Sequence, residues 1–175
     1  MCDSRIIAIC GSKNSGKTTL ITRLLPVLNE KGYKVAVIKH DGHDFACDIP
    51  GTDSYRFTEN GAYGVAVFSP HRVFIHKSAE EENENALISM FPEADIILIE
   101  GLKDSDYPKI EVIRQEISGR PVSNPEGRFL IATDLDGEDA DGLPGENIVS
   151  IDNIEEIASF ILKVRCRPGT GKRTL

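Results

Sequence analysis

Cysteine is scarce in this chain, and long apolar runs are missing. The four cysteines, at positions 2, 10, 47 and 166, form no C-x-x-C pair, so we expect reduced thiols of the kind found in cytosolic proteins. No apolar run approaches the roughly 20 residues that span a bilayer. The first predicted strand begins at once, without the charged and apolar segments of a leader. We therefore expect a soluble, intracellular protein.

An excess of positive charge is also missing. The chain has 20 basic and 28 acidic residues, a net charge of −8, which opposes binding to a phosphate backbone. We therefore expect neither a nucleic-acid partner nor a membrane partner. Its 175 residues suffice for one well-buried domain but not for two ordinary ones. We predict a single domain over residues 1–164 and a flexible basic tail over residues 165–175.

The clearest motif is G-x-x-x-x-G-K-T, which occupies Gly11–Thr18. An apolar run, Arg5–Cys10, precedes it, and leucines at helical spacing follow it, so the motif lies between a buried strand and a helix. In that context the glycines let backbone amides approach an anion, and Lys17 supplies a point charge to the β- and γ-phosphates. The sequence therefore predicts a nucleotide-binding loop.

The rest of the chain predicts an α/β fold. Apolar runs predict strands at residues 34–38, 95–100, 109–113, 129–133 and 148–150, and helices are predicted near residues 53–60 and 154–164, the latter capped by Asp152. Alternation of strands and helices predicts a mostly parallel sheet with helices on both faces, as in P-loop NTPases. Two more runs, at residues 64–68 and 72–75, predict a β-hairpin added at one edge of the sheet.

Two oxygen-bearing side chains are candidates for holding Mg²⁺. Glu100 ends a strand of four consecutive aliphatic residues, the position of a Walker B carboxylate. A charge directly after a buried strand needs a partner. Mg²⁺ between phosphates takes only one or two protein oxygens besides water, and the hydroxyl of Thr18 with the Glu100 carboxylate would supply them.

A polar segment over residues 39–56 follows the second predicted strand, at the ligand-binding edge of such a sheet. One interpretation is a switch-like loop that contacts the γ-phosphate. A second is a hydrophilic surface loop without chemistry. A third treats His40, His43 and Cys47 as ligands of zinc or nickel.

Base recognition has a partial signal at Thr133–Asp136. The order Thr-Asp-Leu-Asp keeps the outer residues of the [N/T]-K-x-D element that reads guanine in many GTP-binding proteins, but Asp134 stands where that element has lysine. The segment favours GTP over ATP modestly, and a plain acidic turn is the alternative.

Seven segments are informative when they are taken together: the loop Gly11–Leu20, Val37–His40, His43–Phe45, Asp48–Arg56, Asn60–Ala62, Ile99–Lys103 and Pro108–Arg114. Together they resemble one family, the MobB accessory proteins of molybdopterin-guanine dinucleotide biosynthesis. The resemblance covers roughly residues 5–135 in the order of the family's motifs. It implies a cytoplasmic, homodimeric protein that binds GTP and Mg²⁺, hydrolyses GTP weakly, and assists a MobA-type molybdenum cofactor guanylyltransferase in attaching GMP to molybdopterin.

The combined expectations assign a role to each candidate residue. Lys17 and Glu100 are the expected catalytic residues, and the expected metal-binding residues are Thr18, Glu100 and, by resemblance, Asp44. The expected nucleotide-binding residues are Gly11, Asn14, Ser15, Gly16, Lys17, Thr18, Thr19, Asp53, Arg56, Thr133 and Asp136. Arg56, or an arginine of a partner, is the candidate for the positive charge that fast GTPases place on the transferring phosphate.

Two other classes of protein compete with this interpretation. A metallochaperone-type GTPase for nickel enzymes would use His40, His43 and Cys47 as metal ligands. In that class, however, the Walker B strand typically ends in a Glu-Ser-Gly-Gly-like sequence, whereas this chain has Glu100-Gly101-Leu102. A small-molecule kinase or ATP-dependent ligase would need an arginine-rich lid and a substrate pocket, and neither is evident in the sequence.

Overall fold

The computed structural model describes residues 4–42, 48–78, 84–144 and 147–166. These residues belong to two compact units, one formed by Met1–His40 together with Ala86–Leu175 and the other by Asp41–Asn85. The single domain predicted over residues 1–164 thus contains a second compact unit. Each unit is described separately below.

The first unit is built on a six-stranded sheet in the order β2-β5-β1-β6-β7-β8, with every neighbouring pair parallel. Its strands are β1 (Arg5–Cys10), β2 (Val35–Lys39), β5 (Ile96–Glu100), β6 (Lys109–Ile113), β7 (Arg128–Thr133) and β8 (Ile148–Ser150). From β1 the chain goes to β2 at one edge, returns to β5 beside β1, and then continues to β6, β7 and β8 on the other side of β1, so the direction of the connections reverses at β1 and β5. The loop after β1 therefore lies at the switch point, where open α/β sheets bind ligands.

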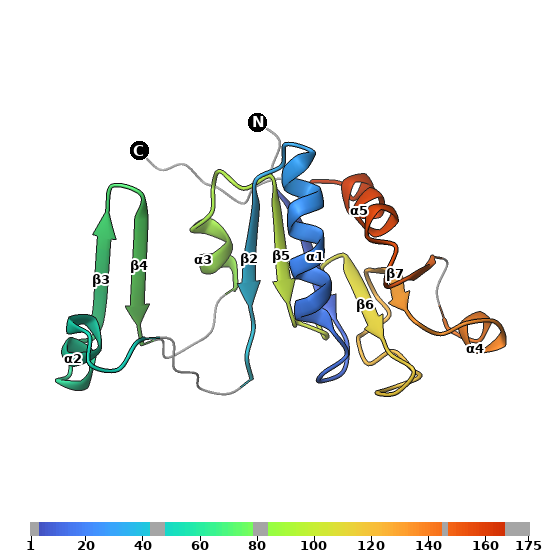
Figure 1. Cartoon of the computed structure of the whole chain (residues 1–175), viewed down its shortest axis with the longest axis horizontal. Helices are drawn as coiled ribbons and strands as arrows, with labels where there is room; N and C mark the ends of the chain where they lie inside the picture. The colour runs from blue at the N-terminus through green and yellow to red at the C-terminus, as the bar shows by residue number, and fades with distance from the viewer. Residues whose placement is uncertain (1–3, 43–47, 79–83, 145–146, 167–175) are drawn as a thin grey trace. The chain divides into compact units, whose positions relative to one another are not determined.

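Helices cover both faces of this sheet, as the sequence predicted. On one face α1 (Lys17–Glu30) and α5 (Ile154–Lys163) lie side by side (Figure 1) and share a core with the alternate residues of β1, β5, β6 and β7. On the other face, Ile88 of α3 (Glu84–Ser89) packs against a smaller cluster that includes Ile97 and Ile99. Among the described residues, none of the helices combines the length and apolarity needed to cross a bilayer.

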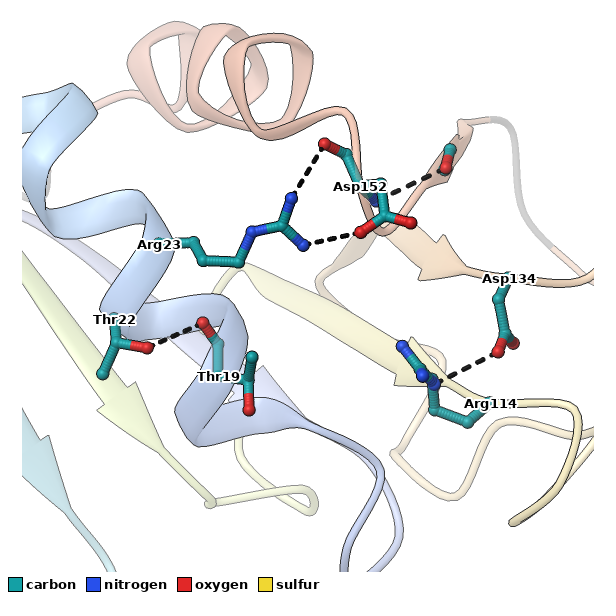
Figure 2. A network of polar contacts seen from close by, with 7 residues as sticks. Thr19, Thr22, Arg23, Arg114, Asp134 and Asp152 are labelled. Carbon is teal, nitrogen blue, oxygen red and sulfur yellow. Dashed lines mark hydrogen bonds and ion pairs between the residues drawn. The ribbon is translucent and has the colours of Figure 1, made fainter.

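The N-terminus of α5 differs from the prediction by one residue. The cap is Asn153, whose side chain accepts from the backbone N–H of Glu156 at 3.3 Å and donates to the Glu156 carboxylate at 2.6 Å. Asp152, the predicted cap, instead forms a 2.6 Å ion pair with Arg23 of α1 (Figure 2). Two adjacent residues were each able to cap the helix, and the residue that caps it is the one that is not paired with Arg23.

The second unit contains α2 (Asp53–Glu59) and an antiparallel hairpin of β3 (Gly64–Ser69) and β4 (Arg72–Lys77). The predicted hairpin is present, but its strands form a two-stranded sheet of their own. Its predicted place at an edge of the main sheet is wrong, because β2 and β8 are the edges there. The alternation and the turn specify how these strands pair with each other, but not whether either pairs with a third strand.

Candidate functional site

The loop between β1 and α1 has backbone conformations that most amino acids adopt only at a cost. Gly11, Asn14 and Gly16 have positive φ angles of 140°, 65° and 93°. A Cβ at Gly11 would lie 2.4 Å from the carbonyl oxygen of Val112 and 2.6 Å from Ser15 Oγ. Glycine is therefore required at position 11 on both conformational and steric grounds, and the loop passes directly over the end of β6.

The helix that follows has no side chain capping its N-terminus. Gly16 is the N-cap residue, and the Leu20 N–H donates to its carbonyl oxygen at 2.8 Å. The N–H groups of the first turn have no partners within an α-helix, and the helix dipole makes that end positive. Ser15, 1% exposed, adds a buried hydroxyl with no hydrogen-bond partner among the described residues. This end of α1 is therefore suited to an anion.

Lys17 is the first residue of α1, and its side chain turns back over the loop. Its Nζ donates to the carbonyl oxygens of Gly11 at 3.0 Å and Ser12 at 2.7 Å. The ammonium thus lies at the loop rather than in open solvent. Further along the helix, the carbonyl oxygen of Thr19 accepts from the Thr22 hydroxyl at 2.9 Å (Figure 2).

Thr18 and Glu100 meet across 82 positions of sequence. The hydroxyl of Thr18 donates to the two carboxylate oxygens of Glu100 at 3.1 and 3.0 Å. Glu100, 8% exposed, ends β5, which lies beside β1 in the sheet. The structure therefore brings together the two oxygen-bearing residues that the sequence predicted for a magnesium ion.

The backbone after Glu100 turns sharply. Gly101 and Leu102 have positive φ angles of 117° and 53°, and the left-handed region is costly for a leucine. The turn is held from two sides, since Gly101 N–H donates to Ile9 at 3.0 Å and Cys10 Sγ donates to the Gly101 carbonyl oxygen at 3.1 Å. Contacts to β1 therefore hold the main chain next to Glu100.

A cavity of about 300 Å³ lies beside this turn. The residues that line it are Cys10, Gly11, His40, Gly101, Leu102, Lys103, Asp104 and Ser105. Cys10 is the last residue of β1 and the others follow the carboxyl ends of β1, β2 and β5, so the cavity adjoins the loop and the Thr18–Glu100 pair.

Three polar or titratable side chains are buried side by side beneath the loop. Cys10 pairs with Glu111 in the sheet register, and burial together with the Glu111 charge raises the pKa of the Cys10 thiol to about 12. One Glu111 oxygen accepts from the Val122 N–H at 2.8 Å, whereas the other has no partner among the described residues. Lys109, fully buried, donates to the Ser105 carbonyl oxygen. These contacts attach the connecting loops to the sheet.

The predicted base-recognition segment has a defined structural role. Thr133 is 2% exposed, and its hydroxyl accepts from the Leu135 N–H at 3.0 Å. Asp134 forms a 3.1 Å ion pair with Arg114 and accepts from the Gln115 N–H at 2.8 Å, which links the ends of β6 and β7 (Figure 2). Asp136 is exposed. The segment is thus a turn with an exposed carboxylate at its end.

The remaining predicted site residues lie in the second unit or outside the residues that the structure describes. Asp53 and Arg56 lie in α2, where Arg56 Nη1 is 3.8 Å from Asp53 Oδ1. Asp48 organises the start of this helix by accepting from Ile49 N–H at 2.8 Å, and Thr52 is the N-cap. Asp44, a predicted metal ligand, lies outside the described residues, as do His43 and Cys47 of the alternative metal site.

Sequence reasoning missed one residue of the site and two beneath it. Lys39, considered only as part of a polar loop, places Nζ 3.1 Å from Glu100 Oε1. The sequence does contain a signal for this pair, because Lys39 and Glu100 each come directly after an apolar run that predicts a buried strand. Lys109 and Glu111 gave only the signal of charges within an apolar strand, which does not say what they contact.

Comparisons with known proteins match most of this chain to one family. The family model described as MobB, molybdopterin guanine dinucleotide synthesis protein B, matches residues 6–134. A relative in Escherichia coli (strain K12), named molybdopterin-guanine dinucleotide biosynthesis adapter protein, is 30% identical over 166 residues, which cover 90% of this chain and 91% of the relative.

Solved structures resemble the chain as well. A crystal structure of molybdopterin-guanine biosynthesis protein B is 28% identical, with a TM-score of 0.68, and the match covers 90% of this chain and 97% of that one. A structure of Bacillus subtilis MobB shows the same fold at 23% identity, with a TM-score of 0.69 and coverage of 92% and 97%. The predicted P-loop NTPase-like α/β fold is confirmed. Because the family model matches well over half of the residues, the chain belongs to the MobB family.

Proposed function

We propose that this protein binds GTP with Mg²⁺ and acts as an adapter in molybdopterin-guanine dinucleotide biosynthesis. The observation that carries the proposal is the hydrogen-bonded pair of Thr18 and Glu100, which lies at the uncapped start of α1. A hydroxyl and a carboxylate at this position supply the two protein oxygens of a nucleotide-bound magnesium ion. The adapter role follows the printed name of the Escherichia coli relative.

The residues present fit a magnesium nucleotide. The backbone amides of the loop and the unpartnered hydroxyl of Ser15 would receive phosphate oxygens, as would the side chain of Lys17. The residues proposed to hold the phosphates are Gly11, Asn14, Ser15, Gly16, Lys17, Thr18 and Thr19. Thr18 and Glu100 would hold Mg²⁺, and Asp44 stays a further candidate ligand on the basis of the family resemblance.

Hydrolysis would be slow and secondary to binding. When bound, Mg²⁺ neutralises charge on the β- and γ-phosphates. Lys17 would stabilise charge on the transferring group, and Glu100 would orient the magnesium ligands around it. Fast GTPases add an arginine at the γ-phosphate, worth about 10³ to 10⁵ in rate. Arg56, or an arginine of a partner protein, is the candidate for that position, and Asp53 would orient Arg56 through their ion pair.

Guanine would be recognised at the turn of Thr133–Asp136. Asp136 is exposed and would accept from the guanine ring. Thr133 would act indirectly, because its hydroxyl already shapes the turn. Parallel calorimetric titrations with GTP and ATP, each with Mg²⁺, test this. We expect GTP to bind more tightly than ATP, and the preference to fall in Asp136→Ala. Equal or tighter binding of ATP would contradict the proposal and favour a kinase or ligase.

The proposed partners are a MobA-type guanylyltransferase and a second copy of this chain, in the cytoplasm. Support for the homodimer comes from the hairpin of the second unit. Phe68 pairs with Val73 and Ala66 with Ile75 across its strands, so all four share one face. Phe68, Val73 and Ile75 are 82%, 70% and 55% exposed. A contiguous apolar surface of this kind is typical of a protein–protein interface.

A further inference from the structure

Lys39 ends β2 and reaches across the sheet edge to the Walker B carboxylate. Lys39 and Glu100 are in register on adjacent parallel strands, and Nζ lies 3.1 Å from Glu100 Oε1. The lysine side chain is 57% exposed and that of the glutamate 10%. The ammonium is therefore positioned by a buried carboxylate while one side of it faces solvent.

This ion pair lies at a specific point of the proposed nucleotide site. Glu100 accepts from Thr18 as well as from Lys39, so a single carboxylate separates the Lys39 ammonium from the Thr18 hydroxyl. In P-loop proteins the hydroxyl at this position binds the magnesium ion that bridges the β- and γ-phosphates. A cation one carboxylate beyond it would lie close to that ion and to the phosphates it holds.

The two lysines of the site are held differently. Lys17 donates to the carbonyl oxygens of Gly11 and Ser12, and both belong to the loop that cradles the phosphates. Lys39 comes from another strand and has an acidic partner. Because a lysine carries three donors and its long side chain rotates freely, its ammonium can contact a phosphate oxygen while it retains the bond to Glu100.

We propose that Lys39 is a specificity-determining residue that contacts the terminal phosphate and distinguishes GTP from GDP. The inference rests on the proposed GTP–Mg²⁺ site. A positive charge near the γ-phosphate attracts the triphosphate more strongly than the diphosphate, because the interaction between charges falls with distance and GDP lacks the nearest one.

The test compares three variants with the wild-type protein: Lys39→Met, Lys39→Arg and Lys31→Met. Lys31 is the matched control, because its Nζ forms a 3.0 Å ion pair with Glu155 after the C-terminal end of α1, away from the loop. Calorimetry gives the dissociation constants of GDP and of a non-hydrolysable GTP analogue, each with Mg²⁺. Circular dichroism checks that each variant is folded.

We expect Lys39→Met to weaken binding of the GTP analogue by about tenfold and to leave GDP binding unchanged. Lys39→Arg retains the charge and should keep most of the preference, and Lys31→Met should match the wild type. Equal weakening of both nucleotides in Lys39→Met, or no change in either, would overturn the inference alone. Failure of the wild-type protein to bind either nucleotide would instead remove the proposed function and this inference with it.

Discussion

The hydroxyl of Thr18 lies 3.0 Å from one carboxylate oxygen of Glu100 and 3.1 Å from the other. The two residues come from different elements, the start of α1 and the end of β5. Parallel strands place both at the same edge of the sheet, and contacts to β1 hold the main chain next to Glu100 there. This pair joins the phosphate-binding loop to the rest of the fold.

Thr18→Val should remove the magnesium dependence of nucleotide binding. Valine keeps the shape of threonine but lacks the oxygen that the ion requires. We expect calorimetric titrations of GTP in Mg²⁺ and in EDTA to give nearly equal affinities for this variant, whereas the wild type should bind more tightly in Mg²⁺. Thr22→Val is the control, because its hydroxyl bonds only one turn back and its magnesium dependence should match the wild type. Full magnesium dependence in Thr18→Val would contradict the assignment of the ligand.

Gly11→Ala should destabilise the fold more than Gly16→Ala does. Both glycines have positive φ angles, which cost an alanine about 1–2 kcal/mol. Only at Gly11 would the new Cβ also meet backbone, at 2.4 Å from Val112, and such overpacking adds about 1–3 kcal/mol. Urea unfolding of both variants measures the difference in the free energy of unfolding. Equal losses of stability would contradict the close contact between Gly11 and the β6 backbone.

The raised pKa of Cys10 predicts a loss of stability at alkaline pH. Between the ordinary value of 9.0 and the folded value of about 12, the unfolded thiol loses its proton while the folded thiol keeps it. The folded state then binds more protons, so stability falls as pH rises in this window, by at most about 1.4 kcal/mol per pH unit, and is unaffected below it. Urea unfolding at pH 8, 9.5 and 10.5 should show a steeper decline for the wild type than for Cys10→Ala. Parallel declines would contradict the burial of the thiol.

Phe68→Asp should weaken the proposed homodimer. The substitution places a charge within the exposed apolar face of the hairpin, where it would have to be desolvated on association. Light scattering after gel filtration should show a dimer for the wild type and a monomer for the variant. Ser69→Asp adds the same charge on the opposite face of β3 and should stay dimeric. A dimeric Phe68→Asp would place the interface elsewhere.

Much of the first unit was predictable because its signals are local. The apolar runs of β1, β5 and β6 are too continuous for surface strands, and Gly11–Thr18 defines its own loop. Glu100 was predictable as a partner of Thr18 because one ends an apolar strand and the other follows the loop after another. Parallel strands place both residues at the same edge of the sheet. Those inferences need only the neighbours of each residue and the rule that parallel strands end at one edge.

What the sequence could not supply was the choice between partners of similar chemistry. Asp152 and Asn153 are both able to cap α5, and only the position of Arg23 on another helix separates them. Lys39 belongs to a polar stretch in the sequence, and its pairing with Glu100 depends on β2 lying beside β5. The hairpin likewise contains no information about a third strand, so its separation from the main sheet appears only in the structure.

The most direct test of the account is the affinity of the wild-type protein and of Lys17→Ala for GTP with Mg²⁺, measured by calorimetry beside circular dichroism. The account predicts that the wild type binds GTP and that Lys17→Ala loses detectable binding while its spectrum is unchanged, because the ammonium donates to carbonyl oxygens of the loop and does not pack in the core. Unchanged affinity in a folded Lys17→Ala would contradict the assignment of Gly11–Thr18 as the nucleotide site.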